Sequence, residues 1–255
     1  MLDLKTFDVR IKYYKLIMIM DNLKNIDIPL PKGYHFEFFK NDKDIKDWIE
    51  IHISTGEFAS FEDCRKTFYD FYSPFFAELD KRLFFIVDEN NKKIATATLS
   101  PTENKDYPCV IDWFAVHKEF QGKKLSKPLL GKIIELAINF DYDKILLHTQ
   151  TNSWLAAKIY LDFGFVPYNT NEKTGWDILK TITNHPKLND FKVVKENEIF
   201  DPLIVNIQKS LSNIYDDFNF NVWYINGRND VYVYSSNNFY EYKFYDCGNK
   251  LVKVK

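Results

Sequence analysis

Hydrophobic and polar residues follow two different periods along this chain, and the two periods predict where strands and helices lie. Short apolar runs rich in β-branched and aromatic residues are typical of buried strands, and they occur at 33–39, 83–87, 94–99, 110–116 and 144–149. Apolar residues three or four positions apart predict amphipathic helices between them, at 42–53, 61–79, 125–140 and 153–163. With a last strand after these, the order is strand, two helices, three strands, helix, strand, helix, strand. This order predicts an α/β fold with a mixed sheet.

Residues that start, break or end helices support these ranges. Short polar side chains cap helix N-termini, proline interrupts a helix, and glycine often ends one. The residues with this character are Asn41 or Asp42, Ser60 with Asp63, Pro74 and Gly164.

The segment 110–130 joins a predicted strand to a predicted helix through a basic loop that contains Gly122. Free backbone N–H groups at a helix N-terminus, with the helix dipole behind them, form a site for anions. Lys123, Lys124 and Lys127 add positive charge there. The segment therefore predicts a phosphate or pyrophosphate site, although the lysines could instead be the solvated start of a helix.

Two motifs resemble those of the GCN5-related N-acetyltransferases (GNATs). The run Val116-x-x-x-x-Gln121-Gly-Lys-Lys-Leu-Ser126 resembles the acetyl-CoA loop of this family, with Lys124 where the family prefers Gly and Ser126 where it prefers Gly or Ala. The run 153–165 resembles the second motif, an Ala-x-x-x-Tyr helix that ends in Gly-Phe. The resemblance covers roughly residues 32–181 and implies the acyl-CoA N-acyltransferase fold.

The resemblance also implies an activity and a set of site residues. It implies transfer of an acetyl group from acetyl-CoA directly to a primary amine of a small molecule or peptide, leaving CoA. By resemblance the pantetheine arm pairs with backbone at the end of the strand, the pyrophosphate lies on the loop, and Tyr160 protonates the departing thiolate. The cofactor-binding residues so implied are Phe114, Ala115, Val116, Gln121, Gly122, Lys123, Lys124, Leu125, Ser126, Lys127, Ser153 and Tyr160.

The catalytic roles leave alternatives open. Tyr160 could be an ordinary tyrosine on the buried face of a short helix. Asp112 could hold a water that deprotonates the amine, or it could lie on a solvated face or in an ion pair. Glu57, His117 and His148 are lesser candidates for the base, since a single histidine on a strand is more often structural. The departures at Lys124 and Ser126 motivate a second function, a CoA-binding module without catalysis in which the C-terminal region is an interaction element.

Three segments are expected along the chain. Residues 1–31 form an N-terminal strand extension and linker, 32–181 the acetyltransferase domain, and 182–255 a small α+β domain with a helix and a β-meander. The small domain is expected to pack on the main domain or on a second subunit, so a homodimer stays open. Its tyrosines could stack on bases or sugars, but their alternation fits the hydrophobic face of a sheet. It could also deliver a macromolecular substrate.

Composition narrows the partners further. A net charge of −2 gives no general attraction to nucleic acid or to an anionic membrane. The three cysteines are far apart, so they form neither a metal-ligand spacing nor a disulfide framework, and no metal is expected. Reduced thiols indicate the cytoplasm, and the abundance of Lys, Asn, Ile, Tyr and Phe suggests an AT-rich bacterial genome.

Overall fold

The computed structural model describes residue 4 and residues 7–58, 60–168, 170, 173–223, 229–235 and 238–254. The chain divides into two compact units. One is continuous, Ile17–His148, and the other joins Met1–Leu16 to Thr149–Lys255. This division follows spatial contacts, so the three segments 1–31, 32–181 and 182–255 stay a prediction.

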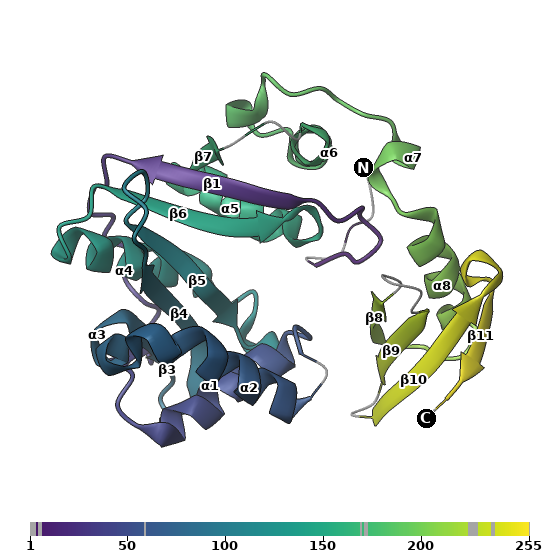
Figure 1. Ribbon diagram of the computed structural model, residues 1–255, viewed down its shortest axis with the longest axis horizontal. Coiled ribbons are helices and arrows are strands. Elements are labelled where there is room, and N and C mark those ends of the chain that lie inside the picture. The colour runs from purple at the N-terminus through teal and green to yellow at the C-terminus, as the bar shows by residue number, and fades with distance from the viewer. Residues whose placement is uncertain are drawn as a thin grey trace. The chain divides into compact units, whose positions relative to one another are not determined.

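A mixed sheet forms the centre of the continuous unit (Figure 1). Its strands follow the order β2-β3-β4-β5-β6-β1; β2 to β5 are antiparallel neighbours, and β5 pairs with β6 in parallel. The strands are β1 Lys15–Asp21, β2 His35–Phe38, β3 Leu83–Val87, β4 Lys93–Pro101, β5 Cys109–Val116 and β6 Lys144–Gln150. The predicted alternation of elements is confirmed, and the structure is of the mixed α/β class.

The helices of this unit begin and end where the local sequence predicts. Asn41 caps α1 by accepting from the N–H of Lys43, and Ser60 caps α2 by accepting from the N–H of Asp63. Pro74 follows the end of α2 and begins a short 3₁₀ segment instead of a further helical turn. The helical segments are α1 Asp42–Ser54, α2 Phe61–Tyr72, η1 Ser73–Glu78, α3 Leu79–Arg82, η2 Lys118–Phe120 and α4 Ser126–Asn139.

The helices cover opposite faces of the sheet because successive side chains of a strand point to opposite sides. Leu83, Phe85 and Val87 of β3 belong to the hydrophobic cluster formed with α1 and α2. Phe84, between them, instead contacts Phe36 of β2, with 5.8 Å between ring centroids. Lys132 of α4 lies over that same Phe36 ring.

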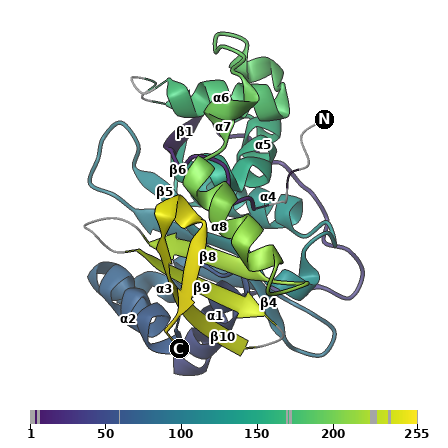
Figure 2. The same ribbon diagram turned by 90° about the vertical axis from the view of Figure 1, so that its right-hand side faces the viewer.

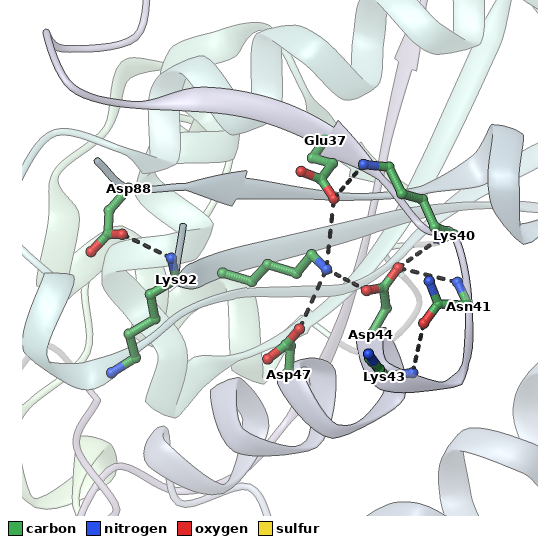
Figure 3. Close-up of polar contacts among 9 residues, drawn as sticks. Glu37, Lys40, Asn41, Lys43, Asp44, Asp47, Asp88 and Lys92 are labelled. Carbon is green, nitrogen blue, oxygen red and sulfur yellow. Dashed lines mark hydrogen bonds and ion pairs between the residues drawn. The ribbon is translucent and has the colours of Figure 1, made fainter. Parts of the chain in front are cut away.

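A buried ion-pair network attaches α1 to the sheet edge (Figure 3). The Lys93 ammonium contacts the carboxylate of Asp44 and lies 3.3 Å from Asp47 Oδ2 and 3.8 Å from Glu37 Oε1. Asp44 also accepts from the backbone N–H of Lys40, so it caps the helix and pairs with the lysine together. Burial opposes the charge of Lys93, but the hydrogen bond and attraction of Asp44 outweigh burial and raise the pKa of Lys93.

The second unit combines helices, one short strand and a separate sheet. The N-terminal segment is held by 199–201: the N–H of Lys12 donates to the carbonyl of Ile199, the N–H of Asp201 donates to Arg10, and Ile11 bridges to Phe200. The elements are η3 Thr151–Ser153, α5 Trp154–Phe163, β7 Val166–Tyr168, α6 Thr174–Thr183, η4 Pro186–Leu188, α7 Glu196–Ile199, α8 Pro202–Ser212, β8 Asn219–Trp223, β9 Asp230–Ser235, β10 Asn238–Tyr245, η6 Asp246–Gly248 and β11 Lys250–Lys253.

The C-terminal residues form the predicted helix and meander. The four-stranded antiparallel sheet has the order β11-β10-β9-β8, and α8 lies along it (Figure 2). Ile207 and Leu211 of α8 pack with Val231 and Val233 of β9 in one buried cluster. The tyrosines of β9 and β10 divide between the two faces: Tyr242 lies in this cluster, whereas Tyr232 stacks on Phe239.

Candidate functional site

The end of β5 has ladder partners in β4 but not in β6. Its parallel pairing with β6 consists of Val110↔Leu146 and Ile111↔Leu147 and stops there. On the other side, the pairing with β4 continues to Val116↔Ala95. Along residues 112–116, which the structure describes in full, one backbone edge of β5 therefore lacks a partner in β6. Phe114, Ala115 and Val116, the residues implied to pair with a pantetheine arm, lie on this stretch.

A β-bulge bends β5 within the same stretch. The pairs Thr96↔Ala115 and Thr98↔Asp112 leave Trp113 and Phe114 opposite the single residue Ala97. Trp113 has φ 51°, which a tryptophan adopts only where the surrounding structure imposes it. Bulges of this kind occur next to active sites, where they redirect side chains.

The turn after β5 is fixed by side-chain to backbone hydrogen bonds. Gln121 donates from Nε2 to the carbonyl of Val116 at 3.2 Å, and His117 Nδ1 accepts from the N–H of Glu119 at 3.3 Å. Burial and the charge of Lys92 lower the pKa of His117, which favours the neutral ring that this hydrogen bond requires. The loop is thus held in a defined shape before α4 begins.

The loop then turns through two residues with left-handed backbone. Gly122 has φ 77° and Lys124 has φ 63°. The position where the family prefers glycine therefore has the backbone conformation that glycine favours, although a lysine occupies it. The substitution keeps the shape of the loop and adds strain.

The start of α4 offers backbone N–H groups to an anion. The first helical residue is Ser126, so Ser126 does not cap the helix, and Leu125 before it gives no side-chain cap. Among the residues that the structure describes, no atom accepts from the N–H of Gly122 or from those of 124–127. Such groups bind phosphates well because the helix dipole adds to their partial charge.

Three lysines surround these N–H groups. The Lys123 ammonium lies 4.1 Å from the centre of the Phe120 ring, which holds it beside the loop. Lys124 and Lys127 are exposed, and neither forms an ion pair within the described part of the chain. The loop therefore combines positive charge with free donors, and this is the chemistry that a pyrophosphate needs.

Tyr160 and Ser153 lie in the second unit, on and before α5. Tyr160 is buried and its carbonyl accepts from the N–H of Phe165, while Gly164 ends the helix with φ 118°. This is the glycine stop that the sequence predicts. Ser153 does not cap α5; its Oγ accepts from Gln150 Nε2 at 2.9 Å.

The candidate bases are dispersed. Asp112 is half-buried in β5, and its charge adds to burial in raising the pKa of Tyr72. His148 is exposed on β6. Glu57 contacts His52, a residue to which the sequence assigns no role. The sequence gives little reason to single out His52 as a functional residue, because it lies among the other buried residues of α1.

Two further features are absent from the described residues. They contain no group of three His, Cys, Asp or Glu side chains placed to hold a metal ion. None of the helices described is both long and apolar enough to cross a membrane.

Comparison with known proteins gives a family and a fold. The family model described as Acetyltransferase (GNAT) family matches residues 45–165. The structure of a GCN5-related N-acetyltransferase from Sphaerobacter thermophilus is similar, with 13% sequence identity and a TM-score of 0.51. The aligned part covers 62% of this chain and 49% of that chain. A tandem GNAT protein from the clavulanic acid biosynthesis pathway has 15% sequence identity and a TM-score of 0.50. The aligned part covers 62% of this chain and 51% of that chain. The chain thus spans about half the length of these structures, and no curated protein matches it.

Proposed function

Because the chain belongs to the GNAT superfamily through residues 45–165, we propose that it is an acetyl-CoA-dependent N-acetyltransferase. Membership of the family supports acyl transfer in general. The acetyl-CoA donor and an acceptor with a primary amine, on a small molecule or a peptide, are the specific parts of the proposal. A cytoplasmic location, a bacterial source and a homodimer stay predictions from the sequence.

One observation carries the proposal: a strand whose pairing with its parallel neighbour stops at Ile111 leads directly into a basic anion loop. At Ala115 and Val116 the edge of β5 has no ladder partner in β6, so an extended amide-containing arm can pair with it there. The free N–H groups of Gly122 and 124–127 follow, beside Lys123 and Lys127. Pantetheine and pyrophosphate are joined in this same order in coenzyme A, so the residues present fit this group.

In the proposed reaction the chain mainly binds and orients its substrates. Acetyl-CoA supplies an activated thioester, which needs little more than correct placement beside a neutral amine. We assign binding of the pantetheine arm to Phe114, Ala115 and Val116 and, by the resemblance, to Ser153. Binding of the pyrophosphate falls to the loop residues Gln121, Gly122, Lys123, Lys124, Leu125, Ser126 and Lys127.

Proton transfers complete the assignment. Tyr160 is the proposed donor to the departing thiolate, a role that requires a phenol held in place, and Tyr160 is buried at the end of α5. Asp112 is the base proposed from the sequence, through a bound water. Its half-buried position on the bulged strand is compatible with that role.

Calorimetric titration with acetyl-CoA, dephospho-CoA and ATP tests the proposal. We expect micromolar binding of acetyl-CoA and weaker binding of ATP, which lacks the pantetheine arm. Gly122→Asp should abolish binding, because Gly122 has φ 77° and an aspartate adds strain and negative charge at the pyrophosphate. Unchanged affinity in this variant would show that the loop does not hold the pyrophosphate.

A further inference from the structure

His52 and Glu57 form a close pair in the continuous unit, at the end of α1. His52 is completely buried, and its Nδ1 lies 2.5 Å from Glu57 Oε2. The other ring nitrogen, Nε2, is also buried and has no hydrogen-bond partner among the described residues. Because a carboxylate only accepts, Glu57 fixes the proton of a neutral imidazole on Nδ1. Nε2 then carries a lone pair and is the basic nitrogen.

One indole nitrogen in the same place also lacks a partner. Nε1 of Trp113 is buried without a hydrogen bond to any described residue, whereas the Trp48 side chain interacts with the Tyr72 hydroxyl. The centre of the His52 ring lies 4.2 Å from that of Trp48 and 5.3 Å from that of Trp113. Unpaired buried polar atoms destabilise a fold and are rare, so two of them, His52 Nε2 and Trp113 Nε1, in one cluster indicate a place where a polar ligand binds.

The cluster lies at the bulge of β5. Trp113 is the bulge residue with φ 51°, and its ring stacks on Phe58 with 5.8 Å between centroids. The N–H of Lys118, two residues beyond β5, donates to Ser54 Oγ at 3.1 Å and so ties the end of α1 to the end of the strand. The pair is therefore held beside the backbone stretch to which we assign the pantetheine arm.

We propose that His52 is the base of the acetyl transfer and that Phe58 and Trp113 form an aromatic wall for the acceptor. The inference rests on the proposed function and names its acceptor class, a primary amine that carries an aromatic or apolar group. Phe58 and Trp113 are only partly buried, so part of each side chain is exposed to solvent, where such a group can contact it. Glu57 is a positioning residue, which stabilises the imidazolium and reaches solvent.

The proton balance of the step is simple. The neutral amine nitrogen attacks the thioester carbonyl carbon, the N–C bond forms, and the C–S bond breaks. The proton lost by nitrogen passes to His52 Nε2, and the CoA thiolate takes a proton from Tyr160. Exchange with water returns His52 and Tyr160 to their starting forms.

Other titratable groups pack on this corner and enter its pH dependence. On α2, burial raises the pKa of Cys64 to about 12 and also raises the pKa of Tyr72, so both stay neutral at physiological pH. Asp112 on β5 and the titratable residues of the segment His117 to Glu119 after it are further groups near this corner. Asp112 is thus the competing base, and Asp112→Asn separates the two assignments.

Nuclear magnetic resonance of the imidazole nitrogens tests the inference without turnover. We expect the wild-type ring to carry its proton on Nδ1, and phenethylamine to shift the Nε2 signal more than ethylamine does. A proton on Nε2, or no change with either amine, would overturn the inference. Acetyl-CoA binding is measured on the same sample, and its absence would contradict the proposed function separately.

Kinetics with matched variants gives the second readout. Glu57 and Glu50 have side chains 46% and 48% exposed, so Glu50→Gln is the control for Glu57→Gln. We expect Glu57→Gln to lower kcat by roughly 10-fold, because the imidazole loses the carboxylate that orients it. We expect Glu50→Gln to leave kcat unchanged, and His52→Gln to lower kcat roughly 10²-fold with acetyl-CoA affinity kept. A loss of kcat in Asp112→Asn that is absent from both Glu57→Gln and His52→Gln would assign the base to Asp112.

Discussion

Gln121 donates its side-chain amide to the carbonyl oxygen of Val116, five residues earlier, at 3.2 Å. This bond joins the end of β5 to the start of the anion loop. Gln121 therefore acts on the geometry of the site, whatever contact it makes with a bound cofactor. The relationship gives the first prediction.

Gln121→Ala should weaken acetyl-CoA binding because the loop loses its attachment to β5. A single hydrogen bond contributes about 1 kcal/mol, which corresponds to a roughly 5-fold rise in Kd. Titration calorimetry measures the change, and Gln208→Ala, which removes a side-chain amide on α8, serves as the comparison. An unchanged Kd for Gln121→Ala would show that this bond does not hold the loop.

Lys124→Gly and Lys124→Ala should differ in stability although both remove the same charge. With φ at 63°, a residue with a Cβ is strained, and glycine is not. We expect the glycine variant to be more stable than the alanine variant by about 1 kcal/mol. Urea unfolding measures the difference; equal stability would mean that residue 124 does not keep a left-handed backbone.

Tyr160→Phe should lower kcat with little effect on acetyl-CoA affinity. The ring is buried, so phenylalanine preserves its packing while it removes the proton donor. We expect a loss of roughly 10²-fold in kcat, within the usual range for general acid catalysis. Steady-state kinetics beside calorimetry separates the two effects, and an unchanged rate would remove the role assigned to Tyr160.

His117 should make the protein less stable in mild acid. Burial and Lys92 lower its pKa from 6.5, so the folded state binds the proton less tightly than the unfolded chain. Stability therefore falls as the pH drops below about 6.5, and the loss is complete once the pH is below the folded-state pKa. His117→Asn keeps an acceptor for the N–H of Glu119 and should lack this loss. Urea unfolding at about pH 7.5 and about pH 5.5 compares the two proteins.

Lys93→Met should destabilise the continuous unit because it leaves Asp44 charged, buried and without its lysine. Breaking a buried pair of this kind costs roughly 3 kcal/mol. Lys40 is the control: it pairs with Glu37 at 2.8 Å, but its side chain is 61% exposed. Surface pairs contribute at most about 1 kcal/mol, so Lys40→Met should unfold almost like the wild type. Equal losses in both variants would show that the network does not depend on burial.

The sequence was sufficient to predict a local conformation wherever that conformation depends on neighbouring residues alone. The caps at Asn41 and Ser60, the break at Pro74 and the stop at Gly164 each rest on one side chain and the backbone beside it. The helix predicted within 182–255 begins at Pro202, because Asp201 caps it and Pro202 occupies its first position.

The remaining features depend on packing that no local pattern contains. Lysine and tryptophan do not favour positive φ, so neither Lys124 nor the bulge at Trp113 could be predicted from residue type. Glu57 was considered for its own basicity, but its contact with His52 requires the turn through Gly56, whose φ is 82°. The pair was missed because each residue was judged alone.

The bridge between Ile11 and Phe200 has a consequence for how this protein forms during synthesis. The second unit needs both ends of the chain, since Lys12 and Arg10 bond to residues 199 and 201. At ribosomal speeds of about 5–20 residues per second, the roughly 190 residues between them take on the order of 10–40 s to appear. During that interval the continuous unit can already fold. The apolar residues of the N-terminal segment stay exposed to solvent until residues 199–201 have been synthesised. A chaperone that binds short extended segments would have its best opportunity there.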